Sequence, residues 1–433
     1  MARPYELRES RNPIAARLAG ARTLTDRLFG LVRPEALLER PIPERHRLIF
    51  YLGHLEAFDR NLLARGGPCP ELDRLFAFGI DPVDGELPHE PASAWPREPE
   101  VRAYCAATRS AIDQCLSTSD IEERGKEGNE LLNMAIEHRL MHAETLAYAL
   151  HRLPLELKLA QLEPMPSRMA WSGPSMSEVP SGVATLGLPR DGRFGWDNEF
   201  EAHQVEVPGF RIGAFKVTNG EFLDFVHAGG YETASLWDPG NWEWLRRSGR
   251  GHPSFWRLDH SGWVFRGMFR ERPLAMEEPV WLSQAEASAY AAWKGMRLPT
   301  EAEWHRAACG APDGSEREYP WGNEPPTIAH GNFDSYRWDP TPVGSHPEGR
   351  SAFGAYDLLG NGWEWTSTPF APFAGFKANG QYPGYSADFF DGRHFVLKGG
   401  SPRTDAVLLR RSFRNWFQPH YPYLYAGFRL VQP

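Results

Sequence analysis

Two histidines in the N-terminal third of the chain are spaced for metal binding. His138 and His142 lie four residues apart in the segment 125–153, whose apolar pattern predicts one long helix. Side chains at this spacing lie one above the other on the same helix face, so two imidazoles can reach one metal ion. Such pairs also arise by chance in ordinary helices, where they are structural, and the pair alone does not decide between the two interpretations.

A third histidine favours a catalytic metal site. His54 lies in the segment 48–58, a second predicted helix with apolar residues at spacings of three and four. Helical bundles bring such helices side by side and build sites from inward-pointing side chains. Three neutral imidazoles leave coordination positions open, which is typical of a catalytic iron or zinc ion rather than a structural one.

The composition indicates more than one domain and argues against polyanionic partners. The chain has 433 residues, an apolar fraction of 41% and a net charge of −9. This charge argues against nucleic acids and anionic membranes as partners, and no apolar segment approaches the ~20 residues that a transmembrane helix needs. The first ten residues are charged and lack the apolar core of a signal peptide. The four cysteines form no Cys-x-x-Cys motif, which indicates a reduced, cytoplasmic protein.

The predicted fold class is α+β, and the first domain is helical. Residues 1–160 are expected to form an up-and-down bundle of four helices that carries the metal ligands. The segment 66–96 is rich in proline, glycine and acidic residues and is predicted to be a long loop between the second and third helices. The predicted helix starts are Thr23, the residues after Pro43, Pro99 and Gly125.

The second domain is predicted to be irregular. Residues 161–174 contain proline and glycine and are interpreted as a linker. Residues 175–433 combine short strands, turns and a few helices. Thr218 is expected to cap one of these helices. Ser283 and Thr300 are expected to cap two others, each with a glutamate three residues further on that completes a capping box.

Ordered motifs in the second domain resemble a known family. The motifs are 215–222 (FKVTNGEF), 297–304 (RLPTEAEW), 319–322 (YPWG), 360–365 (GNGWEW), 399–401 (GGS) and 426–430 (AGFRL). Together they resemble the formylglycine-generating-enzyme fold, itself a C-type-lectin-like scaffold. The three histidines of the first domain resemble those of the DinB-like bundle. This pairing is similar to the ergothioneine and ovothiol sulfoxide synthases, which are mononuclear non-haem iron enzymes.

The resemblance does not extend to formylglycine chemistry. A formylglycine-generating enzyme uses a pair of cysteines late in this domain, whereas here no cysteine follows Cys309. Some relatives bind calcium, and Asn332, Asp334 and Asn361 are candidate oxygen ligands for Ca²⁺ in the second domain. The alternative for these residues is ordinary hydrogen bonding within loops.

The resemblance implies an Fe(II) enzyme that uses O2 to join a chalcogen to C2 of the imidazole of hercynine, the trimethylated betaine of histidine. Tyr385 falls where the ergothioneine enzymes carry a tyrosine that supplies a proton or hydrogen atom, and the alternative is an ordinary loop tyrosine. Asn415 and Trp416 fall where the family holds substrate. An aromatic face suits a trimethylammonium group, although Trp416 could instead be a core residue. The implied metal ligands are His54, His138 and His142.

Departures from the family pattern concern the chalcogen donor. In enzymes that use γ-glutamylcysteine, an acidic residue follows the Asn-Trp pair, whereas Phe417 stands here. Those enzymes also place arginines in the loop between the second and third helices, whereas residues 84–90 (DGELPHE) are acidic. A neutral, hydroxylated donor fits better, because acids and amides accept hydrogen bonds from sugar hydroxyls. The tail 412–423 also resembles the selenoneine synthase subgroup, which joins a seleno-sugar to hercynine.

The predicted function is therefore C–Se bond formation between a seleno-sugar and hercynine. The first alternative is an ergothioneine-type sulfoxide synthase that uses cysteine or γ-glutamylcysteine, against which Phe417 counts. The second is a non-catalytic carbohydrate- or ligand-binding module, against which the three-histidine set counts. A DinB-type thiol transferase would leave the large second domain unexplained.

Overall fold

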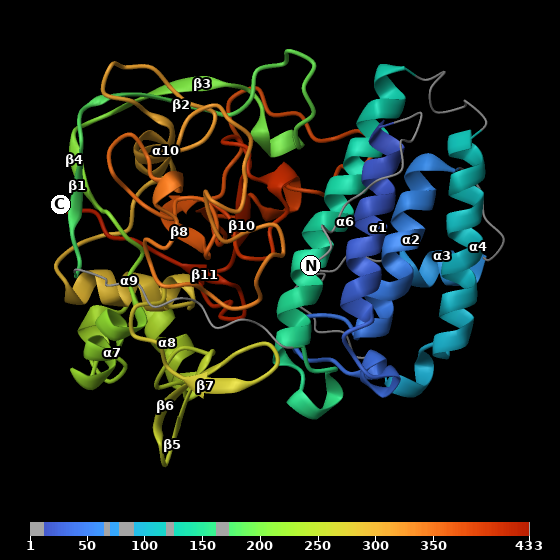
Figure 1. The fold of residues 1–433 in the computed structure, drawn as a ribbon, viewed down its shortest axis with the longest axis horizontal. Coiled ribbons are helices and arrows are strands. Elements are labelled where there is room, and N and C mark those ends of the chain that lie inside the picture. Colours follow the sequence, from blue (N-terminus) through green and yellow to red (C-terminus); the bar gives the residue numbers. More distant parts are fainter. Residues whose placement is uncertain (1–12, 65–69, 78–90, 118–124, 162–172, 433) are drawn as a thin grey trace. The chain divides into compact units, whose positions relative to one another are not determined.

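The chain divides into a helical unit, 1–162, and a mixed unit, 163–433. The computed structural model describes residues 13–64, 70–77, 91–117, 125–161 and 173–432. The division falls inside the segment predicted to be a linker, most of which lies outside the described residues. Helices build the first unit, and helices and strands build the second (Figure 1), which confirms the predicted α+β class.

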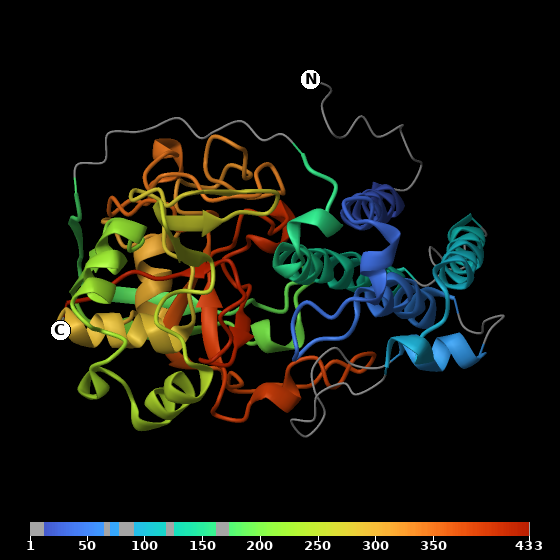
Figure 2. The same cartoon turned by 90° about the horizontal axis from the view of Figure 1, so that it is seen from below.

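Long helices packed side by side form the helical unit. Both views of the fold show α1 beside α6 (Figures 1 and 2), and α2 contacts both α6 and α4. Nearly every residue of α2 is buried, because this helix has neighbours on several sides. The long helices among the described residues are α1 (Pro13–Phe29), α2 (Leu48–Leu63), α4 (Glu98–Ser117) and α6 (Lys126–Arg152).

The predicted starts of α2, α4 and α6 are confirmed, but the start predicted for the first helix is wrong. α1 begins at Pro13, so that Thr23 and Thr25 lie in its interior. Their hydroxyls donate to carbonyls one turn back, Thr23 to Ala19 at 2.9 Å and Thr25 to Ala21 at 3.3 Å. These bonds satisfy polar side chains inside a helix, where the sequence suggested the start of one.

The described residues of the segment 66–96 include helical turns where a loop was predicted. It contains the short helix α3 (Pro70–Phe76) and the turn η3 (Ala92–Ala94). Proline is tolerated at the start of a helix, and Glu71 and Asp73 place negative charge in the first turn, where the helix dipole favours it. Residues 84–90, which the donor argument used, lie outside the described residues.

The mixed unit is organised around a four-stranded sheet with strand order β10-β9-β8-β11. β11 pairs with β8 in parallel, and the other pairs are antiparallel. Smaller sheets pair β1 with β4, β2 with β3, and β5 with β6 and β7. The strands are β1 (Met176–Val179), β2 (Gly182–Leu186), β3 (His203–Val207), β4 (Phe210–Gly213), β5 (Trp256–Asp259), β6 (Gly262–Arg266), β7 (Glu271–Pro273), β8 (Trp363–Pro369), β9 (Phe395–Lys398), β10 (Asn415–Phe417) and β11 (Ala426–Gly427).

The helices of the mixed unit begin where capping was predicted. The side chains of Thr218, Ser283 and Thr300 each accept a hydrogen bond from the backbone three residues on, and all three helices carry complete capping boxes. The sequence pattern missed α8. The helices are α7 (Asn219–His227), α8 (Pro239–Ser248), α9 (Gln284–Trp293) and α10 (Glu301–Cys309).

A buried ionic cluster explains the glutamate of the 360–365 motif. Glu364 accepts hydrogen bonds at 2.7 Å from both Lys216 and Arg429, and all three side chains are fully buried. The motif therefore belongs to the scaffold of the central sheet.

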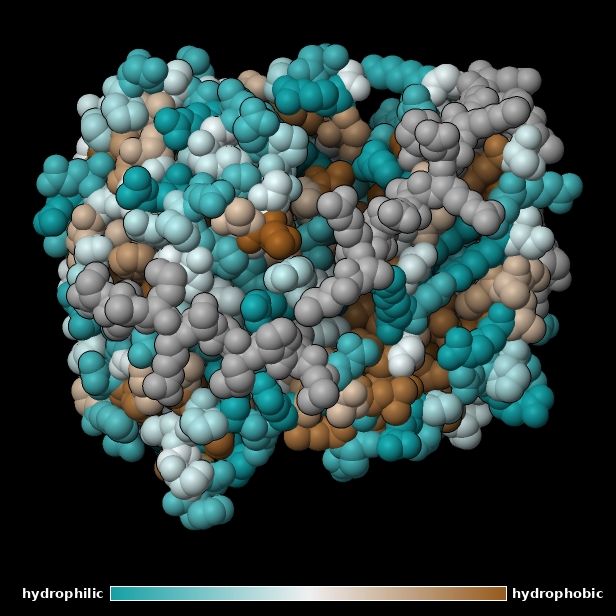
Figure 3. Space-filling view, in the orientation of Figure 1, coloured by the Kyte–Doolittle hydropathy of each residue, from teal (hydrophilic) through white to brown (hydrophobic). Residues whose placement is uncertain are grey.

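On the face drawn in Figure 3 the surface of the mixed unit is mainly hydrophilic. None of the described helices combines the length and the apolar character that crossing a membrane requires.

Candidate metal centre

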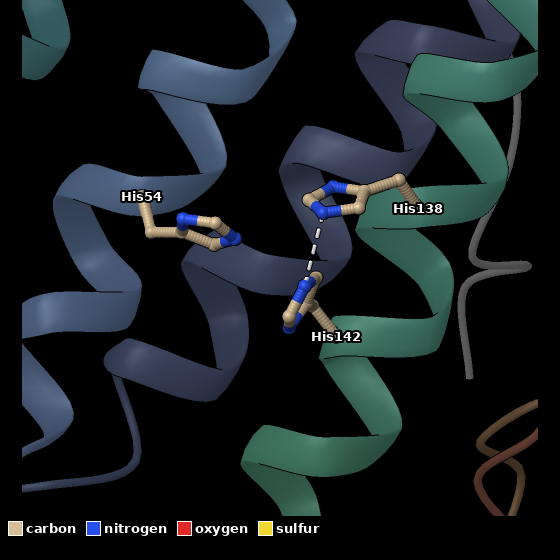
Figure 4. Close-up of side chains that lie close together, drawn as sticks. All are labelled: His54, His138 and His142. Carbon is tan, nitrogen blue, oxygen red and sulfur yellow. Dashed lines mark hydrogen bonds between the residues drawn. The ribbon is translucent and has the colours of Figure 1, made fainter. Parts of the chain in front are cut away.

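Three buried imidazoles converge between two helices of the helical unit. His54 projects from α2, and His138 and His142 project from α6 (Figure 4). One ligand atom from each residue lies within 4.8 Å of the others. The Nε2 atoms of His138 and His142 are 3.0 Å apart, and their ring centroids lie 5.4 and 5.0 Å from that of His54. The structure thus brings together the three histidines that the sequence singled out.

The protonation states suit a metal ion. Burial lowers the pKa of His54 to about 4 and lowers the pKa values of His138 and His142 well below the ordinary value of 6.5. All three rings are therefore neutral at pH 7, as histidine ligands must be. Within the described part of the chain, these residues form the one group of three His, Cys, Asp or Glu side chains close enough to share a metal ion.

A backbone contact selects the tautomer of His54. Its Nδ1 lies 2.7 Å from the carbonyl oxygen of Phe76. A carbonyl can only accept, so Nδ1 carries the hydrogen and Nε2 keeps the lone pair that a metal needs. Phe76 is the last residue of α3, where carbonyls lack partners within the helix. The sequence pattern does not reveal this contact, because the segment that contains α3 is rich in proline, glycine and acidic residues and was predicted to be a loop.

Two phenylalanines stack on the imidazole rings of His54 and His138. Phe50 stacks on His54 with ring centroids 4.9 Å apart, and Phe58 stacks on His138 at 3.4 Å. Phe50 and Phe58 lie four residues before and after His54, so all three share one face of α2. This spacing is visible in the sequence and could have identified both residues. The stacked rings restrict the rotation of the imidazoles and cover them with apolar surface.

A buried ionic cluster joins the ligand-bearing helices. Arg139 of α6 donates to Glu56 at 3.0 Å and to Asp59 at 2.5 Å, both on α2. Arg109 of α4 reaches the same Glu56 at 2.7 Å and also Asp26 of α1 at 2.7 Å. Burial raises the pKa of Asp59 to about 6 against the opposing effect of Arg139, whereas the two arginines overcome burial and lower the pKa of Glu56.

In the mixed unit the structure brings Tyr385 and Trp416 together. Their rings meet edge to face with centroids 5.2 Å apart. Trp416 also stacks on Phe370 at 4.3 Å, and Tyr385, which is 8% exposed, stacks on Trp196 at 4.0 Å. Both predicted site residues therefore belong to one aromatic cluster.

The other two predicted substrate residues, Asn415 and Phe417, lie on the same strand as Trp416 but on its opposite face. Asn415, Trp416 and Phe417 form β10 at the edge of the central sheet. Successive residues of a strand point to opposite faces, so Asn415 and Phe417 face away from the side on which Trp416 lies. Phe417 stacks on Tyr421 at 5.1 Å, and the Asn415 side-chain oxygen accepts from the Trp416 backbone N–H at 2.9 Å.

Hydrogen bonds occupy one of the candidate calcium ligands. The side-chain oxygen of Asn361 accepts from the backbone N–H of Thr341 at 2.9 Å, from its hydroxyl at 3.2 Å and from Asn332 at 3.3 Å. Burial raises the pKa of Asp334 to about 6. The geometry at Asn361 favours the loop hydrogen-bonding alternative, and a calcium site stays a prediction.

Comparison with known proteins identifies the family. Residues 161–433 match the sulfatase-modifying factor enzyme 1-like domain. Hercynine oxygenase of Mycobacterium tuberculosis is 37% identical over 426 residues, which cover 96% of this chain and 98% of that protein. This chain belongs to the ergothioneine and ovothiol sulfoxide synthase family. The resemblance inferred from the motifs is thereby confirmed at the level of the family.

Other members of the sulfoxide synthase family match over most of this chain. Hercynine oxygenase of Mycolicibacterium smegmatis is 36% identical over 440 residues, covering 98% of this chain and 99% of that protein. Ergothioneine biosynthesis protein 1 of Neurospora crassa is 29% identical over 490 residues, covering 92% of this chain but 55% of that protein. The helical unit and the mixed unit are therefore both part of the shared family architecture.

Proposed function

We propose that this protein is an O2-dependent Fe(II) enzyme that joins the selenium of a seleno-sugar to C2 of the hercynine imidazole. The observation that carries the proposal is the buried, neutral set of His54, His138 and His142. Similarity over nearly the whole chain to proteins named hercynine oxygenase supports hercynine as the acceptor. The same two observations, the three-histidine set and the similarity to hercynine oxygenases, support an enzymatic role.

The three histidine ligands fit Fe(II). Imidazole is a ligand that iron, zinc and copper share, and three neutral ligands leave open positions at the ion. The resemblance of the sequence motifs to the mononuclear non-haem iron sulfoxide synthases favours iron among these metals. Bound Fe(II) would supply the redox chemistry with O2. The protein's part is to keep the rings neutral by burial, to hold Nδ1 of His54 protonated through Phe76, and to cover the rings with Phe50 and Phe58.

The aromatic cluster of the mixed unit is proposed to serve hercynine. The trimethylammonium group can neither donate nor accept hydrogen bonds, so an aromatic face such as that of Trp416 suits it. Tyr385 is proposed to hold or deliver a proton at its hydroxyl, and its contact with Trp416 supports a shared role. Asn415, which faces the other side of β10, is proposed to bind substrate there through its side-chain NH2, because its oxygen already accepts from the backbone.

The identity of the donor rests on Phe417. Its ring stacks on Tyr421 and offers no carboxylate to the amino group of an amino-acid donor. A sugar donor carries no such amino group, so the lack of a carboxylate at position 417 removes none of its interactions. A thiol donor, cysteine or γ-glutamylcysteine, is the second candidate, and it is favoured by the similarity to ergothioneine biosynthesis protein 1.

A donor panel tests the proposal. The purified full-length protein is loaded with Fe(II) without oxygen, then mixed with O2, hercynine and one donor: a 1-seleno-sugar, the matching thio-sugar, cysteine or γ-glutamylcysteine. Products are identified by mass. A hercynine adduct that contains selenium is the expected result. Adducts from the thiol donors alone would establish the second candidate, and absence of both iron binding and product would favour a binding module.

A further inference from the structure

We propose that the short helix α3 is a positioning element for the metal centre, and that Asp73, which fastens α3 to the bundle, tunes the affinity of the three-histidine site for its metal. The inference rests on the proposed metal site. Asp73 is a positioning residue, since the ligand atoms are those of the three histidines.

The end of α3 touches His54 directly. The Phe76 carbonyl accepts the Nδ1–H of His54 at 2.7 Å. This bond keeps the hydrogen on Nδ1 and the lone pair on Nε2, and it fixes the ring plane. Without it, the neutral ring would be free to carry its hydrogen on Nε2, which would then have to be removed before a metal could bind.

The side chain of Phe76 anchors the same end. Phe76 is fully buried, and its ring covers Gly53, the residue before His54. A methyl group at Gly53 would lie 2.4 Å from the Phe76 ring, so the absence of a side chain there makes the close approach possible. The ring of Tyr104, on α4, packs against that of Phe76, with the two ring centroids 5.5 Å apart.

Asp73 ties α3 to two long helices. Its carboxylate accepts a hydrogen bond from the Tyr104 hydroxyl at 2.9 Å and forms an ion pair with Arg60 of α2. The side chain of Arg60 is 2% exposed, and its guanidinium lies 5.4 Å from the centre of the Tyr104 ring. Asp73 precedes Phe76 by three residues, so both face the same side of the helix. Fastening Asp73 therefore places the Phe76 carbonyl.

The chain offers a matched control for the loss of such a pair. Asp113 of α4 pairs at 2.7 Å with Arg22 of α1; the Arg22 side chain is 9% exposed against 2% for Arg60, whereas the Asp113 side chain is 61% exposed against 21% for Asp73. Removing either carboxylate deprives a buried arginine of an ionic partner, so Asp113→Ala controls for that loss in the same bundle. The Arg22–Asp113 pair joins α1 to α4 and includes neither His54 nor a residue of α3.

The experiment compares Fe(II) affinity, measured without oxygen by competition with a chelator, in the full-length wild type, Asp73→Ala, Tyr104→Phe and Asp113→Ala. We expect about ten-fold weaker binding in Asp73→Ala, since partners that orient ligands typically contribute 10–100-fold to metal affinity. Tyr104→Phe, which removes one hydrogen bond and keeps the ring, should lose a few-fold. Asp113→Ala should stay within two-fold of wild type.

The ¹⁵N shifts of the His54 ring provide a readout that general destabilisation would not change. The metal-free wild type should show Nδ1 protonated, and Asp73→Ala should show a mixture of tautomers. Equal Fe(II) affinities and tautomers in Asp73→Ala and Asp113→Ala would overturn the inference, and Tyr104→Phe decides the matter where Asp73→Ala does not fold. A wild type that binds no Fe(II) would instead overturn the proposed metal site itself.

Discussion

Arg139 on α6 donates to Glu56 on α2 at 3.0 Å, and both side chains are buried. Arg139 follows the candidate ligand His138, and Glu56 lies two residues after the candidate ligand His54. The ion pair therefore links the two ligand-bearing helices close to the level of the metal centre. It is strengthened by Asp59, which is likewise fully buried.

Replacing Arg139 should destabilise the helical unit strongly. Arg139→Met leaves the buried carboxylates of Glu56 and Asp59 with less compensation, which typically costs about 3–5 kcal/mol. Urea unfolding measures the change. Arg193→Met is the control, because the Arg193–Asp191 pair is exposed to solvent and contributes little to stability. Equal losses in the two variants would contradict the role assigned to Arg139.

A methyl group at Gly53 should weaken the metal site. Alanine favours a helix over glycine by about 1 kcal/mol, so Gly53→Ala would stabilise α2 if nothing lay against it. We expect the opposite, a lower midpoint of unfolding and weaker Fe(II) binding, because the new Cβ would lie 2.4 Å from the Phe76 ring. Gly251→Ala, where the methyl group meets open space, serves as the control. Unchanged stability and affinity in Gly53→Ala would refute the close approach of Phe76.

The stability of the metal-free protein should fall as the pH is lowered from 6.5. Burial lowers the pKa of His54 to about 4, so between pH 6.5 and 4 the unfolded chain holds a proton at this residue that the folded chain does not. This difference destabilises the fold progressively through that window, by about 3 kcal/mol in total for a shift of this size. Urea titrations in a chelator should show a steeper pH dependence for wild type than for His54→Gln. Identical slopes would mean that His54 is not buried as a neutral ring.

An acidic residue at position 417 should shift the choice of donor. Phe417→Asp restores the carboxylate expected to meet the amino group of γ-glutamylcysteine. We expect kcat/KM to fall about ten-fold, or ~1.4 kcal/mol, with the seleno-sugar and to rise with γ-glutamylcysteine. Tyr336→Asp, at a site that is 60% exposed in the same unit, is the control. A loss with both donors would point to a packing role for Phe417 against Tyr421.

Local signals in the sequence predicted much of the fold and the three histidines of the site. The helix that carries His138 and His142 has a clear apolar period, and Ser283 and Thr300 begin capping boxes that the structure contains. These features depend on residues a few positions apart. The motif order, and not any single motif, identified the family.

Features that depend on long-range contacts were not predicted. α3 spans seven residues within a segment rich in proline, glycine and acids, and its stability comes from Arg60 and Tyr104 rather than from an apolar period. The Arg139 cluster joins residues about eighty positions apart. The opposite orientations of Trp416 and Phe417 follow from the pairing of β10 with β9.

The most direct test of the proposed function detects the C–Se bond at C2 of hercynine. Fe(II)-loaded protein is given O2, hercynine labelled with ¹³C at C2, and a seleno-sugar labelled with ⁷⁷Se, and the products are examined by NMR. The account predicts a one-bond ¹³C–⁷⁷Se coupling in the wild type and none in His138→Gln. An active wild type that joins only sulfur from γ-glutamylcysteine or cysteine to C2 would contradict the assignment of selenium.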